Sequence, residues 1–210
     1  MKIIYEPVKF RVDSKKLSEL IKSGKDSFFA YTAQYSHLFK EVKNSGLVLG
    51  CNVKSIKGFK GSTIIFVGDG VFHALMIKKE NLGKKVIVLN PWDYTLKEVH
   101  ENDVKKFISR EIISLERLKN AKKVGIIACT KPGQEKLKES ELIKKKLEME
   151  GKKVYLFLSE TINPDEFMNY SGLDIIINTA CPRIGLDDYS KFGIPIINYE
   201  ILLSEYFKNN

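Results

Sequence analysis

The sequence predicts an α/β protein with two small three-layer lobes, each built on a mostly parallel sheet and joined by a long helix. Three observations predict this fold class. Short β-branched runs alternate with helical periodicity along nearly the whole chain. The order strand-helix-strand recurs in both halves, as parallel sheets require. One helical stretch, about 101–119, is longer than the others, and we expect it to bridge lobes 1–99 and 100–210.

In the first half, apolar or β-branched runs predict strands, and apolar residues at three- and four-residue spacing predict helices. The predicted strands are 2–12 (an edge or entry strand, because of Pro7), 27–32, 63–67 and 85–89, and residues 47–51 are a short apolar run that ends in a cysteine. The predicted helices are 15–22, with Asp13 or Ser14 as its cap and Gly24 as its end, then 34–43, then a short one ending at 76.

The second half repeats the same rhythm more regularly. The predicted strands are 124–128, 154–158, 174–179 and 195–198. The predicted helices are 135–150, 164–169, 186–192 and 201–207. The order strand-helix-strand-helix-strand-helix-strand predicts helices on both faces of the sheet, and the first lobe is expected to be a shortened version of it.

Composition limits the class of protein. No apolar run approaches the roughly 18–20 residues that cross a bilayer, and no signal peptide is visible, so we expect a cytoplasmic protein without membrane contact. The chain has 35 Lys and Arg against 26 Asp and Glu, a net charge of +9. We interpret most of this excess as a solvated lysine-rich surface, with attraction to an acidic macromolecule as the alternative. Direct binding to nucleic acid is not expected.

Three segments that directly follow predicted strands carry residues that could do chemistry, and we call these segments strand exits. The first is Gly68-Asp69-Gly70, which opens a helix and could present amide groups to an anion, with His73 in that helix. A tight turn and a structural histidine are the alternatives. The second exit has Lys131, Gly133 and Gln134, a candidate anion or carboxylate site or a plain turn.

The third exit, 178–183, has the sequence NTACPR and follows a buried apolar run. It places Asn178, Cys181 and Arg183 at the carboxyl end of a strand, where ligands bind in open α/β sheets. Cys51 also follows an apolar run, and two such thiols at facing lobes could share an iron–sulfur cluster. The alternative is that the cysteines are small buried apolar residues.

Several of these segments, in this order and spacing, resemble the diphthamide synthase family, 2-(3-amino-3-carboxypropyl)histidine synthase. The segments are 31–34 (YTAQ), 49–52 (LGCN), 66–73 (FVGDGVFH), 130–134 (TKPGQ), 178–183 (NTACPR) and 192–195 (FGIP). Each segment alone is weak, whereas the ordered set is specific and covers nearly the whole chain.

The resemblance implies three similar α/β domains that each give one cysteine to a central [4Fe–4S] cluster. It implies reductive cleavage of S-adenosylmethionine and transfer of a 3-amino-3-carboxypropyl group to a histidine of the translocation elongation factor. By this resemblance, Cys51 and Cys181 are cluster ligands of the second and third domains. Gly68, Asp69, Gly70, His73, Lys131, Gly133, Gln134, Asn178 and Arg183 are candidates for binding substrate.

The sequence also departs from the family pattern. It begins where the family's second domain begins, so a partner chain or a second copy would have to supply the first domain and its thiol. Cys129 lies in the same lobe as Cys181, and we expect it to be structural rather than the third ligand. Two alternatives stay open: a non-catalytic scaffold subunit of the synthase, and a two-lobed α/β protein that binds a phosphorylated or carboxylate metabolite.

Overall fold

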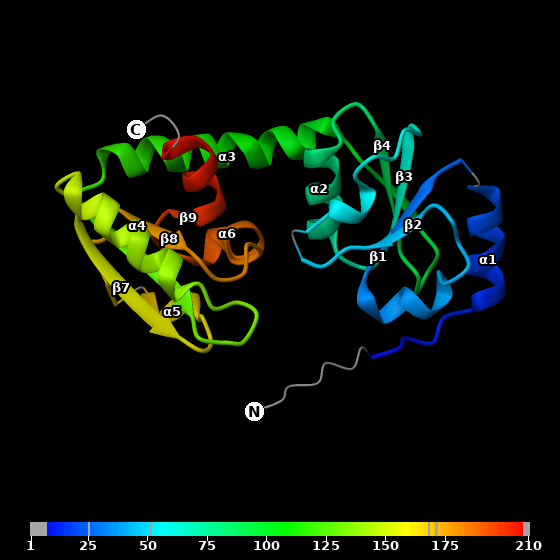
Figure 1. The fold of residues 1–210 in the computed structure, drawn as a ribbon, viewed down its shortest axis with the longest axis horizontal. Coiled ribbons are helices and arrows are strands. Elements are labelled where there is room, and N and C mark those ends of the chain that lie inside the picture. The colour runs from blue at the N-terminus through cyan, green and yellow to red at the C-terminus, as the bar shows by residue number, and fades with distance from the viewer. Residues whose placement is uncertain (1–7, 25, 51, 168, 171, 208–210) are drawn as a thin grey trace. The chain divides into compact units, whose positions relative to one another are not determined.

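The computed structural model describes residues 8–24, 26–50, 52–167, 169–170 and 172–207. The chain forms two compact units, one ending at Lys105 and one beginning at Lys106, so the division falls within helix α3 (Glu101–Asn120). Each unit has its own sheet, and mostly parallel strands confirm the predicted fold class (Figure 1). In the described part of the chain, no helix has both the length and the apolar composition needed to cross a bilayer.

The sheet of the first unit has five strands in the order β2-β1-β3-β4-β5. Four are parallel to one another: β2 (Ser45–Leu47), β1 (Phe28–Tyr31), β3 (Thr63–Val67) and β4 (Lys85–Leu89). The fifth, β5 (Leu96–Val99), runs antiparallel beside β4. The exits of β1, β2 and β3 therefore lie at one edge of this sheet.

Alternation along the strands divides the core of the first unit into two layers. Phe28 and Phe66 face the cluster that includes α2 (Val71–Glu80) and the 3₁₀ helix η2 (Lys54–Ile56). Phe29 packs on the opposite face, in a cluster that includes residues of α1 (Ser14–Ser23) and of the 3₁₀ helix η1 (Ala33–Leu38). Helices therefore cover both faces of the sheet.

The sheet of the second unit has four strands, all parallel, in the order β7-β6-β8-β9. The strands are β6 (Lys123–Cys129), β7 (Lys153–Ser159), β8 (Ile175–Asn178) and β9 (Ile196–Asn198). Strand β8 is central and buried at every position. This explains why its sequence is a continuous apolar run rather than an alternating one.

Helices also cover both faces of the second sheet. Val124, Ile126 and Ile177 pack against residues of α3, α4 (Leu137–Met149) and the short π-helical turn η4 (Leu202–Tyr206). The opposite face packs against α5 (Pro164–Phe167), α6 (Ile184–Asp187) and the 3₁₀ helix η3 (Tyr189–Lys191). The remaining short helix, α7 (Tyr199–Ile201), leads from β9 into η4.

Some sequence predictions for individual elements are wrong. Residues 8–12 form no strand, and residues 2–7 of that prediction lie outside the described residues. The predicted helix 34–43 is only the 3₁₀ helix η1 followed by turns, because the backbone leaves the helical region at Phe39, with a φ of −112° and a ψ of 9°. Strand β5 was not predicted, because three of its four residues are exposed and their sequence lacks an apolar run.

Candidate functional site at the strand exits

The exits of β6, β8 and β9 share one edge of the second sheet, because these strands are parallel neighbours. Strand β8 ends at Asn178, and its register partner on β9 is Asn198. The loop that carries Cys181 follows directly and leads into α6. The polar segment predicted from the sequence is therefore a short loop at the carboxyl end of β8, which is an inner strand of the sheet.

Two asparagine side chains hold this loop. The Asn178 Nδ2 atom donates to the carbonyl oxygen of Cys181 at 2.9 Å and to Asn198 Oδ1 at 2.7 Å. Asn178 Oδ1 accepts from the backbone N–H of Ala180 at 3.1 Å. Asn198 Nδ2 donates to the carbonyl oxygen of Pro182 at 2.9 Å. Asn178 therefore binds the protein's own loop, whereas the sequence suggested it as a substrate ligand.

A second buried group fixes the residue before this loop. Both the backbone N–H and the hydroxyl of Thr179 donate to the carbonyl oxygen of Ile127, at 3.0 and 2.9 Å. The Ser140 hydroxyl, on α4, lies 2.8 Å from the Thr179 hydroxyl and 2.7 Å from the carbonyl oxygen of Lys136. Thr179 and Ser140 are both fully buried. These contacts join β8 to β6 and to α4, so the start of the loop is anchored on two sides.

The two described cysteines have different surroundings. Cys181 is half-buried, and its thiol makes no hydrogen bond within the described residues, so it is open to a metal ion. The Cys129 thiol is buried, donates to the carbonyl oxygen of Glu160 at 3.6 Å and accepts from the N–H of Lys131 at 3.4 Å. Thiolate sulfur is the ligand that iron–sulfur clusters use, so Cys181 fits that role and Cys129 is enclosed by protein.

The second predicted ligand, Cys51, lies outside the described residues. Among the residues described, no group of three or more His, Cys, Asp or Glu side chains is placed to hold a metal ion. The described residues of the second unit thus provide one accessible thiol. The assignment of Cys51 and Cys181 as ligands stays a prediction.

The β6 exit lies beside the Cys181 loop and has exposed polar groups. Lys131 and Gln134 are exposed, and the N–H of Gln134 donates to the carbonyl oxygen of Lys131 at 3.0 Å. Gly133 has a φ of 82°, in the left-handed region that favours glycine. Arg183 is exposed just before α6. Lys131 and Arg183 therefore place two cations at this edge of the second sheet.

At the exit of β3, in the first unit, the two glycines differ. A Cβ on Gly68 would lie 2.6 Å from the Phe66 ring, so only glycine fits there. A Cβ on Gly70 would meet nothing within 4 Å, and Gly70 precedes α2 without a side-chain cap. Asp69 is exposed between them, whereas the half-buried His73 ring stacks on Phe66 with centroids 5.4 Å apart. Gly70 thus leaves the amide end of α2 uncovered.

The same edge of the first sheet has polar atoms that sequence reasoning missed. Thr32 Oγ1, Tyr35 Oη and His37 Nδ1 are buried and have no hydrogen-bond partner in the described structure. All three follow the β1 exit, and Tyr35 is wholly buried. Burial, and then the nearby Asp69 carboxylate, raises the pKa of Tyr35 to about 12. Buried polar groups without partners cost stability, so this edge is suited to a polar ligand.

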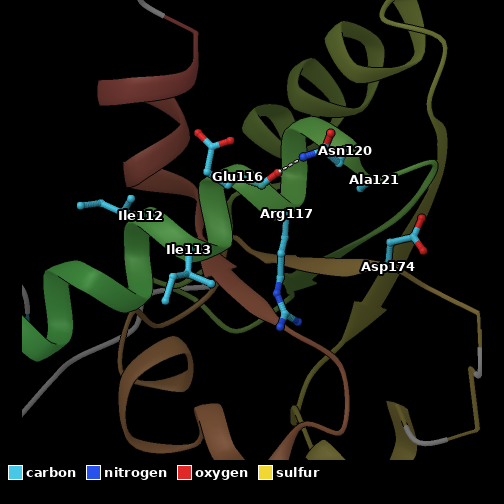
Figure 2. A pocket seen from close by; sticks show the side chains of 7 residues that line it. All are labelled: Ile112, Ile113, Glu116, Arg117, Asn120, Ala121 and Asp174. Carbon is cyan, nitrogen blue, oxygen red and sulfur yellow. Dashed lines mark hydrogen bonds between the residues drawn. The ribbon is translucent and has the colours of Figure 1, made fainter.

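A hollow of about 510 Å³ in the second unit lies elsewhere, between α3 and the start of β8 (Figure 2). Its lining includes Ile112, Ile113, Arg117 and Asp174. The Asp174 carboxylate accepts from the backbone N–H groups of Lys122 and Lys123, both at 2.8 Å. Because this hollow is at the amino end of β8, it is separate from the exits that carry Cys181.

Comparison with known proteins identifies the family. A model for diphthamide synthesis proteins matches residues 1–204. The chain is 35% identical over 209 residues to the 2-(3-amino-3-carboxypropyl)histidine synthase of Methanocaldococcus jannaschii, covering 97% of this chain and 59% of that protein. The chain belongs to the diphthamide synthesis protein family.

Two further relatives are similar to most of this chain. The synthase of Pyrococcus horikoshii is 29% identical over 212 residues, covering 90% of this chain and 60% of that protein. Subunit 1 of the Caenorhabditis elegans synthase is 29% identical over 153 residues, covering 72% of this chain and 38% of the subunit. The chain thus spans about 60% of the length of the two archaeal relatives.

Solved structures of this family have the same fold. A crystal structure of Dph2 from P. horikoshii matches with a TM-score of 0.71 at 23% identity, covering 96% of this chain and 67% of that one. A second structure, of Dph2 from P. horikoshii with a 4Fe–4S cluster, has a TM-score of 0.72 at 26% identity, covering 93% and 63%. These likenesses agree with the two-sheet α/β fold described above.

Proposed function

We propose that this chain is the carboxy-terminal part, or a subunit, of a diphthamide synthase that uses a [4Fe–4S] cluster and S-adenosylmethionine. The observation that carries the proposal is the accessible Cys181 thiol, held on an anchored loop at a strand exit, in a chain of this family. The product would be a histidine of the translocation elongation factor that bears a 3-amino-3-carboxypropyl group.

In this proposal, different residues of the chain bind iron and substrate. Cys181 and Cys51 would bind iron, and the chemistry that a bound cluster supplies is one-electron reduction of S-adenosylmethionine. Lys131 and Arg183 are exposed cations near the Cys181 edge, and a guanidinium can pair with a carboxylate through two hydrogen bonds. They are suited to the carboxylate of the aminocarboxypropyl group.

In the first unit, we propose that the uncovered amide end of α2, with Gly68, Asp69 and Gly70, contributes to substrate binding. Gln134 and Gly133 would do the same at the β6 exit of the second unit. His73 stacks on Phe66, so its ring is held at a fixed angle beside that edge.

A partner is part of this proposal. The chain spans 59% and 60% of the two archaeal synthases, and eukaryotic relatives are named as subunits. We propose that a partner chain carrying the remaining family segment, or a second copy of this chain, completes the ligand set. Three thiols are then available, although one chain supplies only two of them.

Anaerobic reconstitution tests the ligand assignment. Iron and sulfide are counted per chain for the wild type, for Cys51→Ala and for Cys181→Ala, each with a partner chain that carries only the remaining family segment. Cys129→Ala is the matched control, because its thiol is enclosed by protein. We expect loss of iron in the first two variants and full iron in the control. Full iron in either ligand variant would contradict the assignment.

A non-catalytic scaffold is the second candidate, and the partial span of the relatives favours it. In that case, the Cys51→Ala and Cys181→Ala chains would support full transfer to the elongation factor when mixed with a complete synthase. Stabilisation by phosphorylated metabolites but not by S-adenosylmethionine, measured by thermal shift, would instead indicate a metabolite-binding protein.

A further inference from the structure

The loop at residues 180–183 is held by side chains rather than by a regular element. The carbonyl oxygens of Cys181 and Pro182 each accept an asparagine Nδ2–H, at 2.9 Å in both cases. The Cys181 carbonyl also accepts from the N–H of Ile184 at 3.0 Å. The backbone on both sides of the Cys181 side chain is therefore fixed, while the thiol itself stays unbonded within the described residues.

The hydrogen-bond pattern fixes the orientation of both amides. Asn178 uses both Nδ2 hydrogens, one for Cys181 and one for Asn198. Asn198 accepts with Oδ1 and donates with Nδ2 to Pro182. Turning the Asn198 amide over would place two donors face to face and two acceptors face to face, so one arrangement is favoured strongly. Both side chains are at least nine-tenths buried, so water cannot readily replace these bonds.

A glycine on the next helix makes room for this arrangement. A Cβ at Gly185 would lie 2.4 Å from Asn198 Oδ1, a distance that real Cβ atoms do not show. The backbone of α6 therefore packs directly on the Asn198 amide. Because α6 begins immediately after the loop, the amide is enclosed between the loop and the helix that the loop enters.

We propose that Asn198 is a positioning residue for the Cys181 thiol: with Asn178 it fixes the thiol in the orientation in which it binds iron. The proposal deepens the proposed function and rests on it for the iron. Groups that hold a metal ligand in place typically change metal affinity by roughly 10–100-fold when they are lost. Because the loop is held by the protein alone, loss of Asn198 should already change the accessibility of the Cys181 thiol in the iron-free chain.

Alkylation of the iron-free chain tests this without reference to activity. In a Cys51→Ser background, Cys181 is the half-exposed thiol, whereas Cys129 is buried. Peptide masses then give the rate at which iodoacetamide modifies Cys181. We expect Asn198→Ala to raise that rate several-fold, because the loop is released. Asn198→Asp keeps the acceptor for Asn178 but sets a carboxylate oxygen against the carbonyl oxygen of Pro182, so it should also raise the rate.

The matched control is Asn120→Ala, which removes an exposed amide that donates to the carbonyl oxygen of Glu116 at 2.9 Å. It should leave the alkylation rate unchanged. Far-UV circular dichroism shows which variants are folded. If Asn198→Ala does not fold, the alkylation rate of Asn198→Asp tests the inference. An unchanged Cys181 rate in a folded Asn198 variant overturns the inference.

Iron measurements separate this inference from the proposed function. With the partner present, Asn198→Ala should bind iron roughly 10–100-fold more weakly than the wild type, measured by competition with a chelator. If alkylation rises while Cys181→Ala still holds full iron, Asn198 positions the thiol but the ligand assignment is wrong. If Cys181→Ala loses iron while alkylation in both Asn198 variants is unchanged, the ligand assignment holds and the positioning role is wrong.

Discussion

The Asn178 Nδ2 atom lies 2.7 Å from the Asn198 Oδ1 atom, and this hydrogen bond joins the last residues of two neighbouring parallel strands. In parallel strands, register partners point to the same face of the sheet, so the two amides are side by side without any loop bringing them together. Strand pairing therefore brings together the two asparagines whose amides hold the Cys181 loop.

Gly185→Ala should destabilise the second unit, because its Cβ would collide with Asn198 Oδ1. We expect a loss of roughly 1–3 kcal/mol in the free energy of unfolding, as for other overpacked sites. Urea unfolding measures it. Gly193→Ala is the control, since a Cβ there meets nothing within 4 Å. Equal stability of the two variants would show that the Asn198 amide can move aside.

Gly70→Ala should mainly affect binding, whereas Gly68→Ala should mainly affect stability. Gly70→Ala meets open space, so it should lose no more than the roughly 1 kcal/mol that alanine costs at an N-cap. Under the proposed function, its methyl group covers the amide end of α2 and should weaken binding of S-adenosylmethionine. Gly68→Ala should lower stability by roughly 1–3 kcal/mol, because the Cβ would press on Phe66. Calorimetry of binding and thermal unfolding give the two readouts. Unaltered affinity in Gly70→Ala would exclude this helix end from the substrate site.

Tyr35→Phe should stabilise the ligand-free chain at neutral pH by about 1 kcal/mol, because it removes a buried hydroxyl that has no partner. The folded pKa of Tyr35 is raised to about 12 from an ordinary value of 10.0. The folded state therefore keeps the proton longer than the unfolded state, and stability falls as pH rises from 10 through 12. The variant should lose less stability than the wild type over that range.

Thermal unfolding of both proteins between pH 8 and about pH 12 checks this. Tyr206, whose pKa is also raised by burial and by its hydrogen bond to Glu150, contributes equally to both curves. Parallel curves would mean that the Tyr35 hydroxyl finds a partner in solution.

Asp174→Asn should lower stability at neutral pH, because a neutral amide replaces the carboxylate that accepts from Lys123 and Lys122. These backbone hydrogen bonds lower the pKa of Asp174 below 3.8. A lowered folded pKa contributes stability above the unfolded value and loses it as pH falls through the folded value. The stability difference between variant and wild type should therefore shrink in acid.

Urea midpoints at neutral and at acid pH provide this comparison. Asp26→Asn serves as the control, because Asp26 is exposed and makes no hydrogen bond or ion pair within the described residues. A stability difference that persists in acid would mean that shape rather than charge explains the effect of Asp174.

Sequence reasoning predicted the buried strands best. Strands β3 and β4 have the predicted bounds, 63–67 and 85–89, because each is a short apolar run with a polar or glycine boundary. The prediction for 34–43 was wrong because apolar spacing shows which residues are buried and not which helix type connects them. Strand β5 was missed because an edge strand with exposed charges has no periodic signal.

The candidate site was predicted in part. The sequence placed Asn178 and Cys181 at a strand exit, which required only the end of one apolar run. It did not identify Asn198, Ser140 or Tyr35, because their roles depend on strand register, on the buried face of α4 and on packing around η1. A polar residue at the last position of the neighbouring strand is the signal that could have found Asn198.

The anchored Cys181 loop also bears on how such a centre could be assembled. Ordering a residue's backbone costs about 1–2 kcal/mol of conformational entropy. This loop is ordered when the chain folds, and buried hydrogen bonds then offset the cost. Incoming iron would then find a thiol on a loop whose backbone is already ordered. A cluster whose ligands come from separate chain segments can therefore be built stepwise, with the second unit acting as the first docking point.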